Sequence, residues 1–319
     1  MARKTAFSRK AVSVRTAPWS RSLVGWWTHP VLRADAFLLL ASALWGFGFV
    51  AQRLGMRTLG PFTYNAARFL LGTLALLLAV RWTFGARAWA ALGQHRSGWF
   101  WGLWAGLWLF AAASAQQIGL VTTGAGKAGL ITSLYTLWVY LLDRLQGRAR
   151  GWRPLLAVGL ALGGLVILNR TDDPLWQWKT GDAWVLLGSW LWAAHVHWID
   201  QAMKRVHPAP FVVAQFGLTG LLSAGVAWLW EQPSWGAMTQ TWGPILYGGL
   251  VSVAVAFTLQ VLGQRHAPPT HAAILLSLEA VFSILGGLLF LGEGLTLTAF
   301  VGSGLMVSAV LLSAPRGDA

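Results

Sequence analysis

The chain has 319 residues, of which 56% are hydrophobic and 11% are charged, and it carries a net charge of +14. A soluble domain needs roughly 25% charged residues to cover its surface, whereas here apolar runs of about 20 residues recur along the whole chain. This composition excludes an ordinary soluble domain and predicts an integral membrane protein. The absence of cysteine excludes disulfides and thiolate metal sites. The cations lie between the apolar runs, where they indicate membrane topology and not nucleic-acid binding.

The first 33 residues form a basic segment with seven Lys or Arg and no acidic residue. We expect a cytoplasmic tail that lies on anionic lipid. A signal peptide cleaved after Ala43 and a transit peptide are the alternatives. The apolar stretch before Ala43 is too short for the first, and nothing else in the chain supports the second.

Ten apolar segments follow the tail, and their continuous runs, without the two-residue alternation of a barrel strand, predict an all-α protein. The expected spans cover residues 34–54, 61–80, 98–118, 124–143, 153–169, 181–202, 210–230, 242–263, 271–291 and 295–313. With a cytoplasmic N-terminus, 18 Lys or Arg fall on the inner side and four on the outer side. This imbalance predicts a multi-pass protein of the cell (inner) membrane with both termini in the cytoplasm.

The two halves of the apolar region, residues 34–170 and 181–313, resemble each other in sequence. The first half has Asp35, Trp45, Lys127, Leu134 and Tyr135 where the second half has Asp182, Trp192, His271, Leu278 and Glu279. Five spans per repeat is an odd number, so the second copy is inserted upside down. Inverted repeats of this kind surround a central cavity near the membrane midplane in alternating-access transporters.

The chain resembles the drug/metabolite transporter (DMT) superfamily, specifically its ten-span EamA-type branch. The resemblance rests on five short motifs: Ala43-Leu44-Trp45-Gly46, Ala67-Arg68-Phe69, Thr132-Ser133-Leu134-Tyr135, Ser277-Leu278-Glu279-Ala280 and Leu291-Gly292-Glu293. It implies two five-helix bundles around a cavity, and the export or exchange of small metabolites such as amino acids or amphipathic cations. Proline is usual in the family after the ninth-span Glu. Here Ala280 follows it, which puts a helix kink beside the site in doubt.

Glu279 is the leading candidate for substrate binding or ion coupling, because a carboxylate at the bilayer centre normally faces a cavity or a protein interior. A protonated, hydrogen-bonded packing residue is the alternative. Its counterpart Tyr135 is expected to contact substrate. Arg68, within the second span, either pairs with Glu279, binds a substrate carboxylate or holds backbone carbonyls. Lys127 is expected to extend its amine toward the membrane surface.

Further candidates lie on the third and sixth spans. His195 and His197 are either a proton relay, with His197 in reach of Asp200, or part of a polar helix interface. Gly98, Gly102 and Gly106 form a close-packing face, with Trp101, Trp104 and Trp108 on a second face that either lines the cavity or makes lipid or packing contacts. The aromatic pair Trp45 and Trp192 and the neutral side chains Gln116, Gln215 and Gln260 complete the candidates.

The sequence therefore predicts a secondary transporter, monomeric or homodimeric, for a small-molecule substrate in a lipid bilayer, with no cofactor and no metal. No Walker-type GxxxxGK[ST] motif is present, so we expect no ATP hydrolysis. A multi-pass membrane enzyme acting on lipid, which would use His195, His197, Asp200 and Glu231, is the alternative. It gives no reason for two inverted halves, so we expect no enzymatic activity.

Overall fold

The computed structural model describes residues 29–85, 92–93, 95–123, 125–168, 177–282, 284–285 and 296–314. Within these ranges every regular element is a helix. Residues 1–28 of the predicted tail, Glu293, and residues 283 and 286–291 of the ninth predicted span lie outside the described residues, whereas residues 30–33 of the predicted tail are helical.

Helices occur at all ten predicted spans. They are α2 (Pro30–Gly55), α3 (Pro61–Phe84), α5 (Arg96–Leu120), α6 (Ala125–Ser133), α7 (Tyr135–Leu145), α8 (Arg153–Leu168), α9 (Thr180–Met203), α10 (Pro208–Trp230), α11 (Trp235–Gln240), α12 (Trp242–Leu246), η2 (Tyr247–Phe257), α13 (Thr258–Gln264), α14 (Pro269–Ser277) and α16 (Leu297–Ser313). In the described part of the chain, four segments are long and apolar enough to cross a membrane: Pro30–Gly48, Pro61–Thr83, Pro208–Trp230 and Trp242–Gln264.

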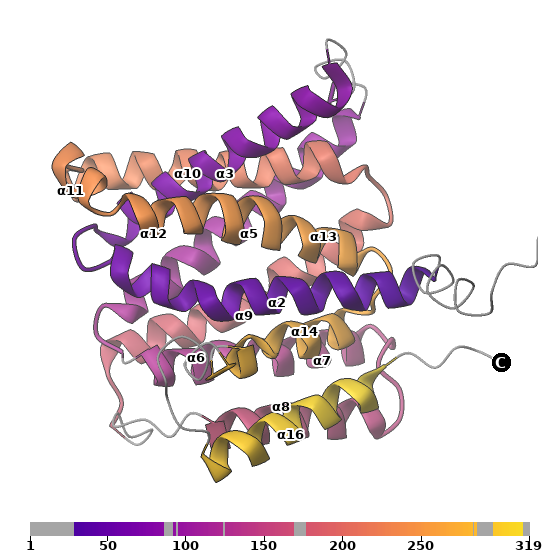
Figure 1. The fold of residues 1–319 in the computed structure, drawn as a ribbon. Coiled ribbons are helices and arrows are strands. Elements are labelled where there is room, and N and C mark those ends of the chain that lie inside the picture. Colours follow the sequence, from indigo (N-terminus) through magenta and orange to yellow (C-terminus); the bar gives the residue numbers. More distant parts are fainter. Residues whose placement is uncertain are drawn as a thin grey trace, which may run out of the picture.

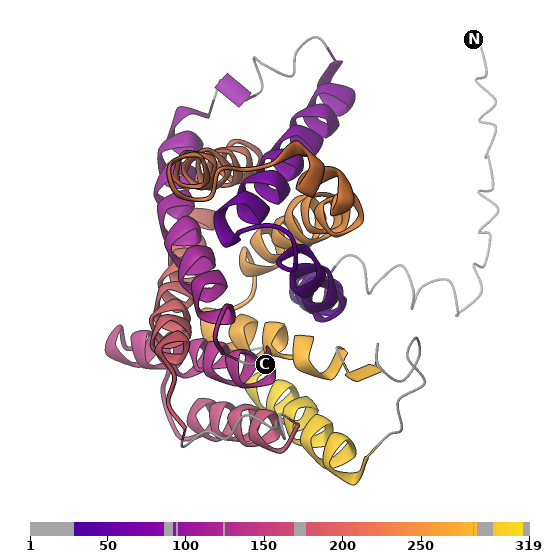
Figure 2. The same cartoon turned by 90° about the vertical axis from the view of Figure 1, so that its left-hand side faces the viewer.

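The long helices lie alongside one another, and α2 begins at the same end of the molecule at which α16 finishes (Figure 1). We call this the tail end, and the opposite end, with the turn between α2 and α3, the far end. Figure 2 views the molecule from the far end and shows α8 and α16 together at one edge. Helices of the first half pack mainly on helices of the second: α3 on α10, α5 on α9 and α10, and α8 on α16.

The predicted glycine face of α5 is confirmed as a close-packing surface. A Cβ atom added to Gly98 would lie 2.6 Å from the Pro210 side chain, and one added to Gly102 would lie 2.5 Å from the Phe211 carbonyl oxygen. Because neither position has room for a side chain, the backbones of α5 and α10 approach closely. This contact joins the two halves beside the cavity described below.

Two helices are interrupted at the positions that the sequence repeat aligns. Leu134 separates α6 from α7 with φ −58° and ψ −16°, and Leu278 follows α14 with φ −62° and ψ −8°. The preceding serines, Ser133 and Ser277, each donate a hydroxyl hydrogen bond to a carbonyl one turn back, at 2.8 and 2.7 Å. Such bonds bend helices. A break beside Glu279 therefore exists although Ala280 replaces the proline.

The glycine contact predicts a position-specific loss of stability. Gly102→Ala forces the α5 and α10 backbones apart and should lower the free energy of unfolding by about 1–3 kcal/mol. Gly159→Ala is the matched control, because its added Cβ meets nothing within 4 Å; it should gain up to about 1 kcal/mol from helix propensity. Thermal unfolding in detergent measures both. Equal stability of the two variants would contradict the packing described here.

Candidate functional site

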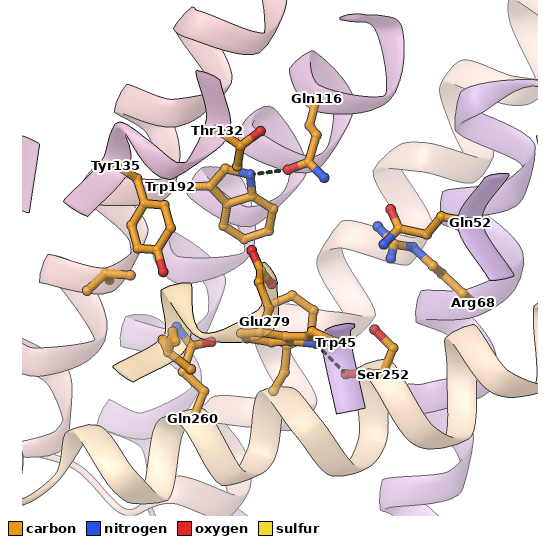
Figure 3. A pocket seen from close by; sticks show the side chains of 13 residues that line it. Trp45, Gln52, Arg68, Gln116, Thr132, Tyr135, Trp192, Ser252, Gln260 and Glu279 are labelled. Atoms are coloured by element: carbon orange, nitrogen blue, oxygen red, sulfur yellow. Dashed lines mark hydrogen bonds between the residues drawn. The ribbon is translucent and has the colours of Figure 1, made fainter. Parts of the chain in front are cut away.

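A cavity of about 80 Å³ lies between the two halves, at the level of the interruptions in α6–α7 and α14 (Figure 3). At about 10–15 Å³ for each water molecule, it has room for roughly six. Its wall combines aromatic, amide and charged side chains from both halves. The lining residues are Trp45, Gln52, Arg68, Gln116, Thr132, Tyr135, Trp192, Val196, Ser252, Phe257, Gln260, Leu276 and Glu279.

Much of this wall consists of matched positions from the two halves. Three pairs of lining residues are separated by the same 144 positions: Gln116 with Gln260, Thr132 with Leu276, and Tyr135 with Glu279. The two tryptophans, Trp45 and Trp192, are a fourth pair. The charged residues break this symmetry, because the counterpart of Glu279 is a tyrosine and Arg68 aligns with Gly217.

Glu279 follows the interruption at Leu278, so its side chain starts a new helical segment at the cavity wall. In the view of Figure 3 its carboxylate lies between the indole rings of Trp45 and Trp192. The ion pairs formed by the described residues do not include Glu279. Among the described residues, Glu279 thus presents a carboxylate to the cavity without an ion-pair partner.

Three aromatic rings form a continuous surface beside this carboxylate. The ring of Phe257 lies 4.7 Å from that of Trp45 and 6.1 Å from that of Trp192, centroid to centroid. Both indole N–H groups are already engaged: Trp45 Nε1 donates to the Ser252 carbonyl and Trp192 Nε1 to Gln116 Oε1, at 3.3 and 2.7 Å. These bonds fix the rings, so their faces are oriented for stacking or cation–π contact.

Arg68 is buried in α3 and also lines the cavity. Its Nε donates to Asn65 Oδ1 at 3.0 Å, and its guanidinium carbon lies 4.8 Å from the centroid of the Phe69 ring. In the described structure Arg68 forms no ion pair with Glu279. Of the three roles expected for Arg68, pairing with Glu279 is therefore not observed. The guanidinium keeps donors for a carboxylate or another anionic group.

Tyr135 lines the cavity as expected, and its hydroxyl donates to the Ala273 carbonyl of α14 at 3.0 Å. This bond joins α7 to α14 across the halves. Opposite them, the wall is completed by η2, an eleven-residue π-helix that supplies Ser252 and Phe257. π-Helical segments are uncommon and are frequently found at functional sites. Sequence periodicity gave no sign of this segment.

Several predicted candidates lie away from the cavity. His195 is fully buried and its Nε2 lies 3.1 Å from Gln215 Oε1, as a polar helix interface requires. Trp101 and Trp104 pack against Trp198 of α9 at 4.7 and 6.2 Å. Trp108 lies 6.2 Å from Trp190 of the same helix. The tryptophan face of α5 is therefore a packing surface with α9 and not part of the cavity wall described above.

His197 and Asp200 each have other partners than the expected one. His197 lies 2.7 Å from the Gln146 amide through Nε2, and its Nδ1 is 3.9 Å from Asp143. Asp200 accepts from Arg148 and from Lys204, both at 2.7 Å. These residues gather at the tail end of the molecule and do not line the central cavity, although His197 directly follows the lining residue Val196 on α9.

The prediction for Lys127 is wrong. Its side chain is 1% exposed and its amine lies 2.6 Å from the Asp182 carboxylate, which Thr123 and the Lys179 backbone also bind. Because α6 packs on the start of α9, an acid is within reach and the amine does not extend toward the membrane surface. The aligned residues form the equivalent pair at the tail end, where His271 lies 3.1 Å from Asp35.

Sequence reasoning missed six lining residues: Gln52, Thr132, Val196, Ser252, Phe257 and Leu276. Gln52 is a polar residue inside an apolar run and could have been found on that ground. Gln116 and Gln260 had been candidates without a rank, and their equivalent spacing in the two halves would have paired them. The remaining members depend on helix packing that no sequence pattern reports.

The apolar helices and the polar cavity between them define a multi-pass membrane protein of the transporter class. Comparison with known proteins is more specific. The model of the EamA-like transporter family matches residues 32–170 and again residues 179–314. The chain belongs to the EamA-like transporter family, which agrees with the predicted place in the DMT superfamily.

The relatives are transporters without an assigned substrate. An "Uncharacterized transporter" of Archaeoglobus fulgidus is 26% identical over 89% of this chain and 87% of its own length. The "Uncharacterized transporter YwfM" of Bacillus subtilis is 27% identical over 88% and 94%. A solved crystal structure with 20% identity superposes with a TM-score of 0.73 over 88% of this chain and 95% of the other, which shows a shared fold.

Proposed function

We propose that this protein is a secondary transporter that exports a small solute bearing an ammonium group and an aromatic or apolar side, by alternating access around the central cavity. The observation that carries the proposal is the Glu279 carboxylate, which faces an aromatic cavity without a cationic partner from the protein. A buried charge of this kind is costly unless a ligand or a proton neutralises it during the transport cycle.

The cavity chemistry favours a zwitterionic or cationic aromatic solute. An ammonium group would lie at Glu279, and the Trp45, Trp192 and Phe257 rings would receive an aromatic ring by stacking. Arg68 offers donors to a carboxylate at the opposite side of the cavity. Because about 80 Å³ is too small for an aromatic amino acid, the walls have to separate for the solute to enter.

The helix contacts support two inverted repeats related by a two-fold axis. In chain order, the first half consists of α2, α3, α5, α6–α7 and α8. The second half consists of α9, α10, η2–α13, α14 and α16, and each of these corresponds to the first-half element at the same place in the order. Contacts then occur in exchanged pairs: α2 with α13 matches α9 with α5, and α14 with α2 matches α6 with α9. The α3–α10 contact and the α8–α16 contact each join two equivalent helices, so exchanging the halves leaves each contact unchanged. Rocking of the halves about such an axis gives alternating access.

Two ion pairs support fixed points for this motion. Lys127 with Asp182 at the far end and His271 with Asp35 at the tail end are equivalent under the repeat, and both are formed in the same conformation. A gate has to open at one end while it is closed at the other. Since both pairs are closed together, we assign them to pivots and not to gates.

The described structure does not bring together the residues that the sequence suggests for an enzyme acting on lipid. Glu231 lies at the far end, where it accepts hydrogen bonds from the Phe62 and Thr63 backbone N–H groups at 2.9 and 2.7 Å. His197 and Asp200 lie at the tail end. Residues at opposite ends of the molecule cannot act on one reacting group.

The role of Glu279 is tested by solute flux. In proteoliposomes with radiolabelled tryptophan as the probe, Glu279→Gln should reduce flux at least tenfold, because the amide is isosteric but carries no charge for the ammonium group. Glu231→Gln is the control and should transport like the wild type, because that carboxylate lies away from the cavity. Flux of Glu279→Gln equal to wild type would make Glu279 a packing residue. Absence of flux in the wild type with tryptophan and with a panel of organic cations would contradict the transporter proposal.

We also propose that the tail end faces the cytoplasm of a cell whose inner membrane holds the protein, as the excess of Lys and Arg there requires. The chain has no cysteine, so single cysteines report cleanly. In intact cells a membrane-impermeant maleimide should label Trp235→Cys, an exposed far-end position, and should leave the exposed tail-end position Arg150→Cys unlabelled. The reverse labelling would invert the orientation.

A further inference from the structure

The tail end contains a second, larger cavity of about 420 Å³ that is separate from the central one. On α14, Thr270 and His271 line the tail-end cavity, whereas Leu276 and, just after the end of this helix, Glu279 line the central cavity. The buried residues Ala272–Leu275 lie between them. The two spaces are thus separated by about one turn of apolar side chains.

Three buried polar atoms at or beside this second cavity lack hydrogen-bond partners among the described residues: Gln264 Oε1, Asp143 Oδ1 and His197 Nδ1. The last two lie 3.9 Å apart. Each of these atoms has an accessible surface below 1 Å². A buried carboxylate oxygen without a donor is costly, and a proton held between Asp143 Oδ1 and His197 Nδ1 would satisfy both atoms.

The neighbouring charges leave this pair unsatisfied. Arg148 and Lys204 both bind Asp200 at 2.7 Å, and Arg148 comes no closer to Asp143 Oδ1 than 4.0 Å. The other titratable or charged groups lining the cavity are Arg265, His266 and His271, and His271 is engaged with Asp35. The cations nearest to Asp143 are thus already committed to another carboxylate.

Gln146 is a hydrogen-bond partner of the His197 imidazole in both of its protonation states. Its amide lies 2.7 Å from His197 Nε2. With Nδ1 bare, the neutral imidazole carries its hydrogen on Nε2 and donates it to the side-chain oxygen of Gln146, and the imidazolium makes the same bond. The imidazole therefore keeps a partner on one side while the other side changes.

We propose that Asp143 and His197 together form a binding site for one proton, which enters from the tail end and couples to transport. This inference rests on the proposed transporter function. A hydronium ion gives its proton to the imidazole and leaves as water, and the imidazolium Nδ1–H then donates to Asp143 Oδ1. The pair gains one positive charge, and its two atoms approach to hydrogen-bond distance.

The second carboxylate oxygen of Asp143 connects the proton site to α14, the helix that leads to the central cavity. Asp143 Oδ2 accepts from the Thr270 backbone N–H at 3.1 Å and from the Thr270 hydroxyl at 2.6 Å. Since the N-cap residue of α14, Pro268, has no polar side chain, Asp143 of α7 caps this helix from the other half. An anion stabilises a helix N-terminus, and an imidazolium beside it reduces that effect. Proton binding thus loosens the hold of α7 on the helix that ends next to Glu279.

A titration tests the shared proton without any solute. Proton uptake of the purified protein between about pH 5 and 8, the range in which histidine titrates, is measured for Asp143→Asn, His197→Gln and the double variant. Both single variants should lose or shift the same one-proton step, and the double variant should lose no more. Asp143→Asn keeps an amide oxygen for Thr270, so it should fold; thermal unfolding checks this. As a control, His29→Gln with Asp143→Asn should be additive, because His29 lies at the exposed start of α2.

Additive losses for Asp143→Asn and His197→Gln, or no change in either, would overturn the proton site. A second arm separates this inference from the proposed function. In proteoliposomes, Asp143→Asn should abolish tryptophan uptake driven by a pH gradient while leaving tryptophan exchange within about twofold of wild type. If Asp143→Asn lost gradient-driven uptake and exchange to the same extent, the role of Asp143 would be structural and not proton coupling. Absence of tryptophan exchange in the wild type, with a non-additive titration, would reject the proposed substrate and keep the proton site.

Discussion

The fold depends on how it accommodates a carboxylate in an apolar interior. Glu279 costs about 2.5–3.5 kcal/mol at the centre of a bilayer unless its surroundings compensate. The surroundings here are three aromatic rings, three glutamines and an arginine that does not pair with it. A pre-formed ion pair would stabilise the resting protein but would remove the reason for a cationic solute to bind. We therefore propose that the absence of a counter-charge for Glu279 among the described residues is the functional feature of the cavity.

The two halves contribute the same aromatic and amide side chains to this cavity but differ in the charged side chains. Trp45 and Trp192, and Gln116 and Gln260, give each half the same wall. Tyr135 and Glu279 occupy equivalent places, yet the tyrosine hydroxyl bonds to α14 while the glutamate faces the solute. Symmetry of shape allows two conformations of similar energy, and asymmetry of charge gives the substrate and the coupling ion a defined place.

Much of this could be predicted from sequence because it depends on local physics. Apolar run length predicts the helices, the glycine spacing of α5 predicts its contact with α10, and the aligned motifs predict which side chains face each other across the cavity. Predictions failed where a partner from a distant segment decides the outcome. Lys127 is held by Asp182, and His197 approaches Asp143 while Asp200 binds Arg148 and Lys204. Neither partner choice has a signature in the spacing of residues along one helix.

We propose that α7 and α14 separate and rejoin during each transport cycle, because proton binding at Asp143 is proposed to loosen the contact between them. Cysteines in place of Asp143 and Thr270, which touch across this contact, allow the two helices to be joined by a disulfide or a short cross-linker. Tryptophan exchange in proteoliposomes is the measurement, before cross-linking, after it, and after release of the link by a reductant. Tryptophan exchange should stop when the two helices are joined and should return when the link is released. Unchanged exchange with the link in place would contradict the proposal.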